Sequence, residues 1–463
     1  MKPKQIILID NQAKIIEDIL SDSTFSIAVM VVYKEKNKEK YLGNHRVKKI
    51  YTMAELNAMD CVGRLDHQTI KTFKQTQLKV ENCLNRQSND YQLRKYVYYS
   101  ALSFWLTIFD TFSIDMVLIY GLTHGYPHDS IPSDIAVQRG IPSYNIENCT
   151  PVKRVLYDNL KACFVPLATV SGTSVDSMVY YASEKSQTRN DIVLARHAHT
   201  KKRFLYKLLQ IGLKFFGVYP YRIYEDIRRG SFFTIGNYGE RFKYSIFSEI
   251  LSALKAKKHK KYLATLEEGP RAGEKYIFFA LHMEPEANIT TRAVLDSQLT
   301  IIMLLSDCLP EGWLLYVKEH PQQHDLQSTS FYEKVYQSEY YRTKFFYDTI
   351  SKIKNVRIIQ SHLGSKSIIA NALAVATLAG TAAWEAVACV KPCFVFVERT
   401  PLRLLEDIFF VDSYQSCLRF MEDLAQGYSP RYSDLENTIS QYTADNTPEG
   451  RKVIIQTLQC LSC

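Results

Sequence analysis

The chain contains two blocks in which short, unbroken apolar segments alternate with stretches of helical periodicity. In the first block the strand-like runs are 6–10, 26–33, 47–52, 115–120 and 143–146. In the second block they are 276–281, 313–317, 356–360, 374–378 and 393–397. Strands that are apolar on both faces and separated by helices are typical of a parallel sheet covered by helices on both sides. The sequence therefore predicts an α/β fold with two Rossmann-like domains.

The length of 463 residues also favours two domains, because one hydrophobic core rarely serves so long a chain. We expect an N-terminal Rossmann-like domain at 1–150 and a helical, basic linker region at 151–270. A C-terminal Rossmann-like domain would follow at 271–410, and helices at 411–463 would pack back on the N-terminal domain. Such sheets bind ligands at the carboxyl ends of their strands, so candidate site residues are sought there.

Charge and hydropathy restrict where the protein acts. No apolar run reaches the roughly 20 residues that span a bilayer, and 1–10 predicts a first strand rather than a cleaved signal. We therefore expect a cytoplasmic protein. Ten cysteines without two paired C-x2-C motifs predict reduced thiols and no metal site.

The net charge of +9 is concentrated in 201–261, where residues 255–261 alone contain five Lys and one His. Such a region attracts an anionic membrane surface or an anionic substrate, which would allow peripheral attachment to the inner face of the cytoplasmic membrane. The periodicity of 204–216 predicts an amphipathic helix, lying either on a membrane or in a core. Nucleic acid is the least expected partner, because the lysines lack interleaved aromatic residues.

The strand at 313–317 ends in Lys318, Glu319, His320 and Pro321. A histidine at this place can donate to a phosphoryl oxygen, and Lys318 would add positive charge. Strand alternation puts Lys318 and His320 on one face and Glu319 on the other. A purely structural histidine is the alternative.

The strand at 374–378 runs into Gly380 and Thr381 and then directly into a helix. Glycine permits close backbone approach, and the free N–H groups at a helix start favour a phosphate. Glu385 follows one turn later on the face of Thr381, where it would bind a ribose or hold the loop. The alternative is a simple helix cap.

Two further groups of polar residues follow strands. His282, Glu284 and Glu286 come after 276–281, and these residue types can act as a carboxylate base or nucleophile with an acid or cation near a leaving group. His128 and Asp129 follow the strand at 115–120 and would face an acceptor. For both groups the alternative is a loop of solvated or loop-stabilising residues.

The motifs 317–321 (VKEHP), 380–385 (GTAAWE) and 391–392 (KP) together resemble the glycosyltransferases of capsule and surface-polysaccharide synthesis. These include the bacterial transferases of 3-deoxy-D-manno-octulosonic acid (Kdo). The segment 281–286 (LHMEPE) is similar to that family's PLHxxPE segment, and 126–129 (YPHD) to its N-terminal Pro-His loop. Ala280 and Ala383 depart from the family pattern. The His-Pro and Ser/Thr pairing also resembles that of bacterial sialyltransferases, which use CMP donors.

The resemblance covers about 115–150 and 275–400 and implies a GT-B fold, with two facing domains and no required metal or cofactor. It implies a nucleotide-sugar donor, CMP-Kdo first, bound by the nucleotide-sugar-binding domain at 271–410 with its phosphate between His320 and Thr381. It also implies a glycan or glycolipid acceptor on the side of the acceptor-side domain at 1–150. The expected catalytic residues are His128, Asp129, His282, Glu284 and Glu286. The expected donor-binding residues are Lys318, His320, Pro321, Gly380, Thr381 and Glu385. The alternatives are a UDP-sugar transferase, a UDP-sugar 2-epimerase on the same fold, or a non-catalytic polysaccharide assembly protein.

Overall fold

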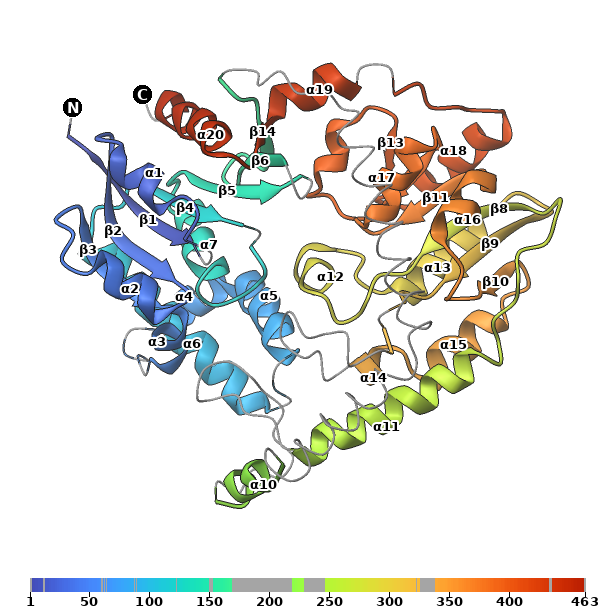
Figure 1. Cartoon of the computed structure of the whole chain (residues 1–463), viewed down its shortest axis with the longest axis horizontal. Coiled ribbons are helices and arrows are strands. Elements are labelled where there is room, and N and C mark those ends of the chain that lie inside the picture. Colours follow the sequence, from blue (N-terminus) through green and yellow to red (C-terminus); the bar gives the residue numbers. More distant parts are fainter. Residues whose placement is uncertain are drawn as a thin grey trace, which may run out of the picture. The chain divides into compact units, whose positions relative to one another are not determined.

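The computed structural model forms two compact units (Figure 1). Unit 1 consists of Met1–Val175, Gly236–Lys243 and Asp434–Cys463, and unit 2 of Asp176–Ile235 and Tyr244–Ser433. The residues that the structure describes are 2–10, 13–59, 61, 63, 65–86, 88, 90–121, 123–149, 153–168, 219–228, 246–321, 323–324, 338–432 and 435–461. The basic residues at 201–214 and the predicted helix at 204–216 lie outside these ranges.

Unit 1 is built on an eight-stranded sheet, sheet A. Its strands are β1 (Lys4–Asp10), β2 (Phe25–Val32), β3 (Val47–Thr52), β4 (Met116–Tyr120), β5 (Ser143–Asn148), β6 (Lys153–Asp158), β7 (Cys163–Val165) and β14 (Thr443–Asp445). Strands β3-β2-β1-β4-β5 are parallel and follow the Rossmann order. Strand β6 then pairs antiparallel with β5, β7 and β14.

Helices cover both faces of sheet A. They are α1 (Ile16–Ser21), α2 (Glu35–Tyr41), α3 (Met53–Ala58), α4 (His67–Thr72), α5 (Lys74–Asn85), α6 (Tyr91–Thr111), α7 (Ser130–Gln138), α19 (Leu435–Tyr442) and α20 (Pro448–Leu461). The helices are needed on both faces because the side chains of the strands are apolar on both faces. In β1, Ile7 and Ile9 pack in the core with α5 and α6, whereas Ile6 and Leu8 pack in the core with α1 and α20.

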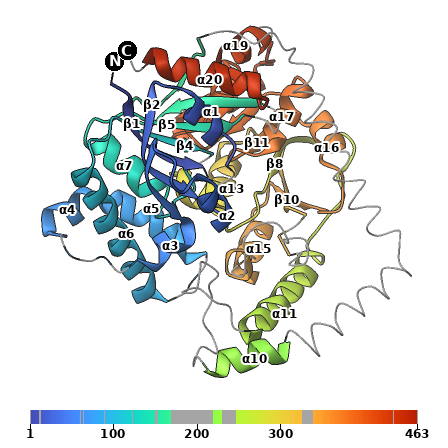
Figure 2. The ribbon, with the colours of Figure 1, turned by 60° about the vertical axis from the view of Figure 1, so that its left-hand side comes forward.

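The C-terminal helix α20 completes the second of these cores. Ile454 and Leu458 are fully buried in it, and Arg451 Nε donates to Asp18 Oδ2 at 2.7 Å. Figure 2 shows α20 beside α1.

Unit 2 is built on a six-stranded, fully parallel sheet, sheet B. Its strands are β8 (Lys275–Ala280), β9 (Trp313–Lys318), β10 (Val356–Ile359), β11 (Ala374–Thr377), β12 (Cys393–Val395) and β13 (Ile408–Phe410). The order β10-β9-β8-β11-β12-β13 is again that of a Rossmann fold. The predicted α/β class with two Rossmann-like, parallel-sheet domains is therefore confirmed.

The helices of unit 2 include a pair, α10 and α11, that precedes the sheet. They are α10 (Tyr219–Arg228), α11 (Ile246–Leu263), α12 (Ala287–Arg292), α13 (Gln298–Cys308), α14 (Ser338–Tyr341), α15 (Lys344–Ser351), α16 (Ser365–Asn371), α17 (Thr381–Ala388) and α18 (Tyr414–Ala425), with a 3-10 turn at Pro401–Leu404. Among the described residues no helix has the length and apolarity needed to cross a bilayer.

Sheet A extends beyond the expected domain boundary at residue 150. Strands β6 and β7 carry it to Val165, so this part of the expected helical region at 151–270 is a hairpin. The C-terminal segment 411–463 is also divided, because α18 belongs to unit 2 and α20 to unit 1.

Gly450 lies in the first turn of α20, directly against β14. A Cβ atom at this position would overlap the backbone of Asp445. We expect Gly450→Ala to lower the free energy of unfolding by about 1–3 kcal/mol, because neither backbone can move without losing β14 or α20. Urea unfolding measures this. The control is Gly269→Ala, where nothing lies within 4 Å; an equal loss in both variants would contradict the clash.

Candidate functional site

The strand order of sheet B reverses between β8 and β11, which marks the place where a Rossmann sheet binds its ligand. From β8 the chain crosses to β9 on one side and later to β11 on the other. The end of β8 delivers His282, and the end of β11 delivers Gly380. Two predicted residues therefore meet at this switch point.

The His282 ring packs against the turn that begins α17. The Ala379 N–H donates to Nε2 at 3.3 Å, so a neutral ring carries its proton on Nδ1. Nδ1 lies 3.4 Å from Glu286 Oε2 and can donate to it. A Cβ atom at Gly380 would lie 2.9 Å from Nε2 and 2.8 Å from Thr377 Oγ1. Position 380 must therefore be glycine for this packing.

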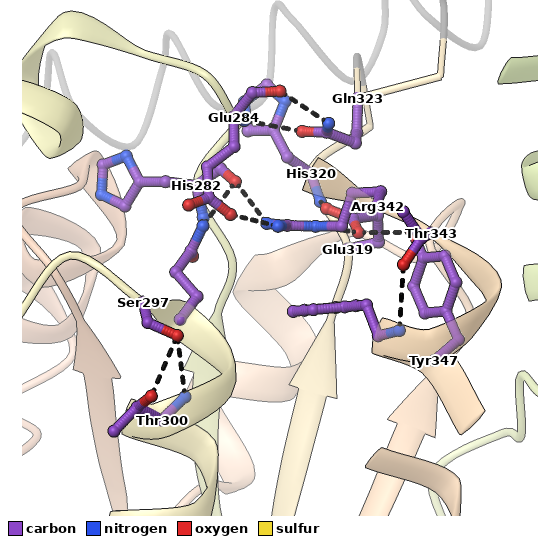
Figure 3. Close-up of polar contacts among 12 residues, drawn as sticks. His282, Glu284, Ser297, Thr300, Glu319, His320, Gln323, Arg342, Thr343 and Tyr347 are labelled. Atoms are coloured by element: carbon purple, nitrogen blue, oxygen red, sulfur yellow. Dashed lines mark hydrogen bonds and ion pairs between the residues drawn. The ribbon is translucent and has the colours of Figure 1, made fainter. Parts of the chain in front are cut away.

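Two buried glutamines hold the backbone after β8. Gln298 accepts from the His282 N–H at 2.8 Å and donates to the His282 carbonyl at 3.1 Å. Gln323 makes the same pair of contacts with Glu284, both at 2.8 Å (Figure 3). Each amide side chain thereby replaces a strand neighbour for one residue of the loop.

Arg342 is fully buried and connects the ends of β8 and β9 (Figure 3). Its Nε donates to Glu319 Oε2 at 2.8 Å, its Nη1 to Glu284 Oε2, and its Nη2 to the His282 carbonyl at 2.9 Å. Burial opposes the charge on Arg342, but the attraction of Glu319 and Glu284 outweighs it and raises the pKa of the guanidinium. Arg342 therefore remains a cation shared by two strand ends.

Glu319 completes this ionic cluster. Its Oε2 also accepts from the Tyr347 hydroxyl at 2.7 Å, and its Oε1 accepts from the His320 N–H at 2.7 Å. Because Glu319 binds Arg342 on one side and the His320 backbone on the other, it orients the strand end that carries His320.

The cluster separates the two candidate carboxylates. Glu284 is 6% exposed and forms a buried ion pair with Arg342, which suits it to positioning the loop. The Glu286 side chain is 36% exposed, precedes α12 and lies next to His282. The geometry favours Glu286 over Glu284 as the carboxylate that reaches a substrate.

The expected donor-binding residues lie along the same edge of sheet B. Lys318 is buried, and burial lowers its pKa, while the nearby carboxylates of Glu385, Glu319 and Glu267 oppose the shift. His320 is half-buried, Pro321 is exposed in the following turn, and Thr381 is exposed in the first turn of α17.

His320 and Thr381 follow strands that are two places apart in the sheet. Strand β8 lies between β9 and β11, so the two strand axes are about 10 Å apart. The imidazole that contacts the Gly380 turn is His282. That His320 and Thr381 share one donor phosphate stays a prediction.

His128 and Asp129 lie in unit 1 and are buried in their own loop. His128 is fully buried and stacks on Tyr126 with ring centroids 5.3 Å apart, and burial lowers its pKa to about 3. Asp129 accepts from the His124 N–H at 3.0 Å and from the Ser130 hydroxyl at 2.9 Å, and burial raises its pKa to about 7. These contacts favour the loop-stabilising alternative over a catalytic role.

Three residues of the site were missed from the sequence: Gln298, Gln323 and Arg342. The available signal was indirect: carboxylates at Glu284 and Glu319, directly after apolar strands, would need a cation once buried. Nothing in the spacing of the chain selects Arg342 as that cation. The two glutamines left no signal at all.

No family model matches the chain, and no curated protein matches it. Among solved structures, the UDP-GlcNAc 2-epimerase from Methanocaldococcus jannaschii aligns over 99% of each chain, with 14% identity and a TM-score of 0.25. KpsC of Thermosulfurimonas dismutans, a beta Kdo 2,7 transferase, aligns over 86% of this chain and 98% of its own, with 11% identity and a TM-score of 0.29. At these identities and TM-scores neither neighbour assigns a function to the chain.

Replacement of Arg342 tests the ionic cluster. We expect Arg342→Met to lower the free energy of unfolding by about 3–5 kcal/mol, because Glu284 and Glu319 would remain buried without a cation. The control is Arg139→Met, which removes a solvent-exposed pair with Asp110 and should change stability by about 1 kcal/mol or less. Urea unfolding at neutral pH measures both, and similar losses would contradict a special role for Arg342.

Asp129 predicts a pH dependence of stability in unit 1. Its pKa is raised from 3.8 to about 7 in the folded chain, so ionisation disfavours the folded state as pH rises from about 4 to about 7. Asp129→Asn removes this loss. We expect the variant to gain stability relative to the parent across that window, by up to about 1.4 kcal/mol per pH unit, and the difference to stay constant above it. Urea unfolding at several pH values measures the free energy of unfolding of both proteins. If that free energy changes with pH in the same way in parent and variant, Asp129 is not a buried carboxyl with a raised pKa.

Proposed function

We propose that the chain is a glycosyltransferase of surface-polysaccharide synthesis. It would transfer Kdo or a related acidic sugar from a CMP-activated donor to a glycan or glycolipid acceptor. The observation that carries the proposal is the His282–Glu286 pair, which lies against the Gly380 turn at the switch point of a Rossmann sheet. Acid–base groups beside a helix start suit the cleavage of a sugar–phosphate bond.

The start of α17 supplies the proposed phosphate site. The Ala383 N–H already donates to the Gly380 carbonyl at 3.1 Å. The N–H groups of Thr381 and Ala382 precede it in the first turn, where aligned peptide dipoles favour an anion. The exposed Thr381 hydroxyl would donate to a phosphoryl oxygen. Lys318 and His320, at the end of β9, would add positive charge and a second donor for a phosphate placed over the end of β8.

Glu286 would perform the chemistry at the anomeric carbon. As a base it would take the proton of the acceptor hydroxyl while that oxygen displaces the CMP phosphate; as a nucleophile it would form a glycosyl-enzyme that the acceptor then attacks. The anomeric configuration of the product distinguishes these two routes. In both, His282 acts as a positioning residue, because its Nδ1–H orients the Glu286 carboxylate.

Donor turnover tests this function. We expect CMP-Kdo to be consumed in preference to CMP-sialate and UDP-sugars, and Glu286→Gln to lower kcat/KM about 10²–10⁴-fold, because the reacting carboxylate is lost. Gly380→Ala should lower it too by displacing His282. The control is Glu311→Gln, an exposed carboxylate just before β9, at the opposite end of that strand from Lys318. Mass spectrometry of the released product measures turnover by the parent chain and by the three variants.

Three results would overturn the proposal. The first is that no nucleotide-sugar is turned over with any acceptor glycan. The second is that Glu286→Gln and His282→Ala leave turnover unchanged. The third is that UDP-GlcNAc alone is converted without an acceptor, which would identify a 2-epimerase instead.

A further inference from the structure

Helices α10 and α11 contact each other in unit 2 (Figures 1 and 2). Both expose large apolar side chains. On α10 the side chains of Tyr221, Tyr224 and Ile227 are 65%, 60% and 58% exposed. On α11 Leu251 and Leu254 are exposed as well. Single exposed apolar residues are ordinary, but five of them on two adjoining helices indicate an interaction surface.

The opposite face of α11 is occupied by the protein itself. Ala256 and Leu263 are buried, His259 is partly buried, and the helix contacts α14 and α15. At 100° per residue, Leu254, Lys258 and Lys261 project within about 60° of one another and directly away from that buried face. The outward face of α11 therefore combines a leucine with two lysines.

The described charged side chains of α11 all carry positive charge. Five lysines of α11 are exposed: Lys255, Lys257, Lys258, Lys260 and Lys261. Among the described side chains of α11, from Leu251 to Leu263, there is no carboxylate. Lys255 Nζ donates to the Tyr340 hydroxyl at 3.3 Å. The exposed lysines therefore favour an anionic partner.

We propose that the α10–α11 surface, defined by the five exposed apolar residues and the five lysines above, docks the chain on an anionic lipid bilayer. Lysines bind anionic headgroups, while tyrosine, leucine and isoleucine side chains gain free energy by entering the boundary between headgroups and acyl chains. A nucleic-acid backbone offers the aliphatic side chains no such environment. This docking does not require donor turnover. It assigns the membrane contact expected of the basic region 201–261 to two helices, α10 and α11.

Vesicle flotation with the full chain tests the docking. We expect binding to vesicles of phosphatidylcholine mixed with phosphatidylglycerol, little binding to phosphatidylcholine alone, and weakening by salt. The triple variant Lys257→Glu, Lys258→Glu, Lys261→Glu should reduce the partition coefficient on the order of a hundredfold. The double variant Leu254→Ser, Ile227→Ser should reduce it as well, and its residual binding should become more sensitive to salt.

Matched controls come from exposed residues elsewhere in the chain. Lys36→Glu, Lys352→Glu, Lys354→Glu makes the same change in net charge, and Leu42→Ser removes another exposed leucine. Both should bind vesicles like the parent chain. The proposal fails if the parent ignores anionic vesicles, if the control triple variant loses binding equally, or if the Leu254/Ile227 variant binds unchanged. Tighter binding to duplex DNA than to vesicles would also overturn it.

Discussion

The candidate site depends on one buried cation. Arg342 joins the loop after β8 to the end of β9 through Glu284, Glu319 and the His282 carbonyl. A buried ion pair of this kind adds little net stability, yet removing one partner leaves the others desolvated and unpaired. Arg342 therefore acts mainly by specifying one arrangement of two strand ends, with the Gln298 and Gln323 amides fixing the backbone between them.

This arrangement gives the neighbouring carboxylates different roles. Glu284 and Glu319 are committed to Arg342, which leaves Glu286 as the partly exposed carboxylate beside His282. The close approach of Gly380 then brings the start of α17 to the same imidazole. A donor molecule bound at this edge of sheet B would therefore contact both the His282–Glu286 pair and the N-terminus of α17. These two contacts are the basis of the proposed sugar transfer.

The strands of both sheets could be predicted because their apolar runs are continuous, and strand ends located His282, His320 and Gly380. The order of the strands could not be predicted, because alternation along the chain does not say which strand lies between two others. In the structure β8 lies between β9 and β11 and so separates His320 from Thr381. Strand β6 was missed because Lys153 and Arg154 interrupt its apolar pattern, although both are buried. Arg342 was missed because an ion pair across the fold leaves no periodic trace.

The packing of α20 on α1 has a consequence for how the chain matures. Unit 1 is discontinuous: β14 and α20 emerge from the ribosome only after the whole of unit 2. Unit 2 can therefore finish folding on the nascent chain while Ile6, Leu8 and their neighbours still lack the Ile454 and Leu458 side chains that cover them. Strands β1 and β2, which are synthesised first, therefore belong to the unit whose core is completed last.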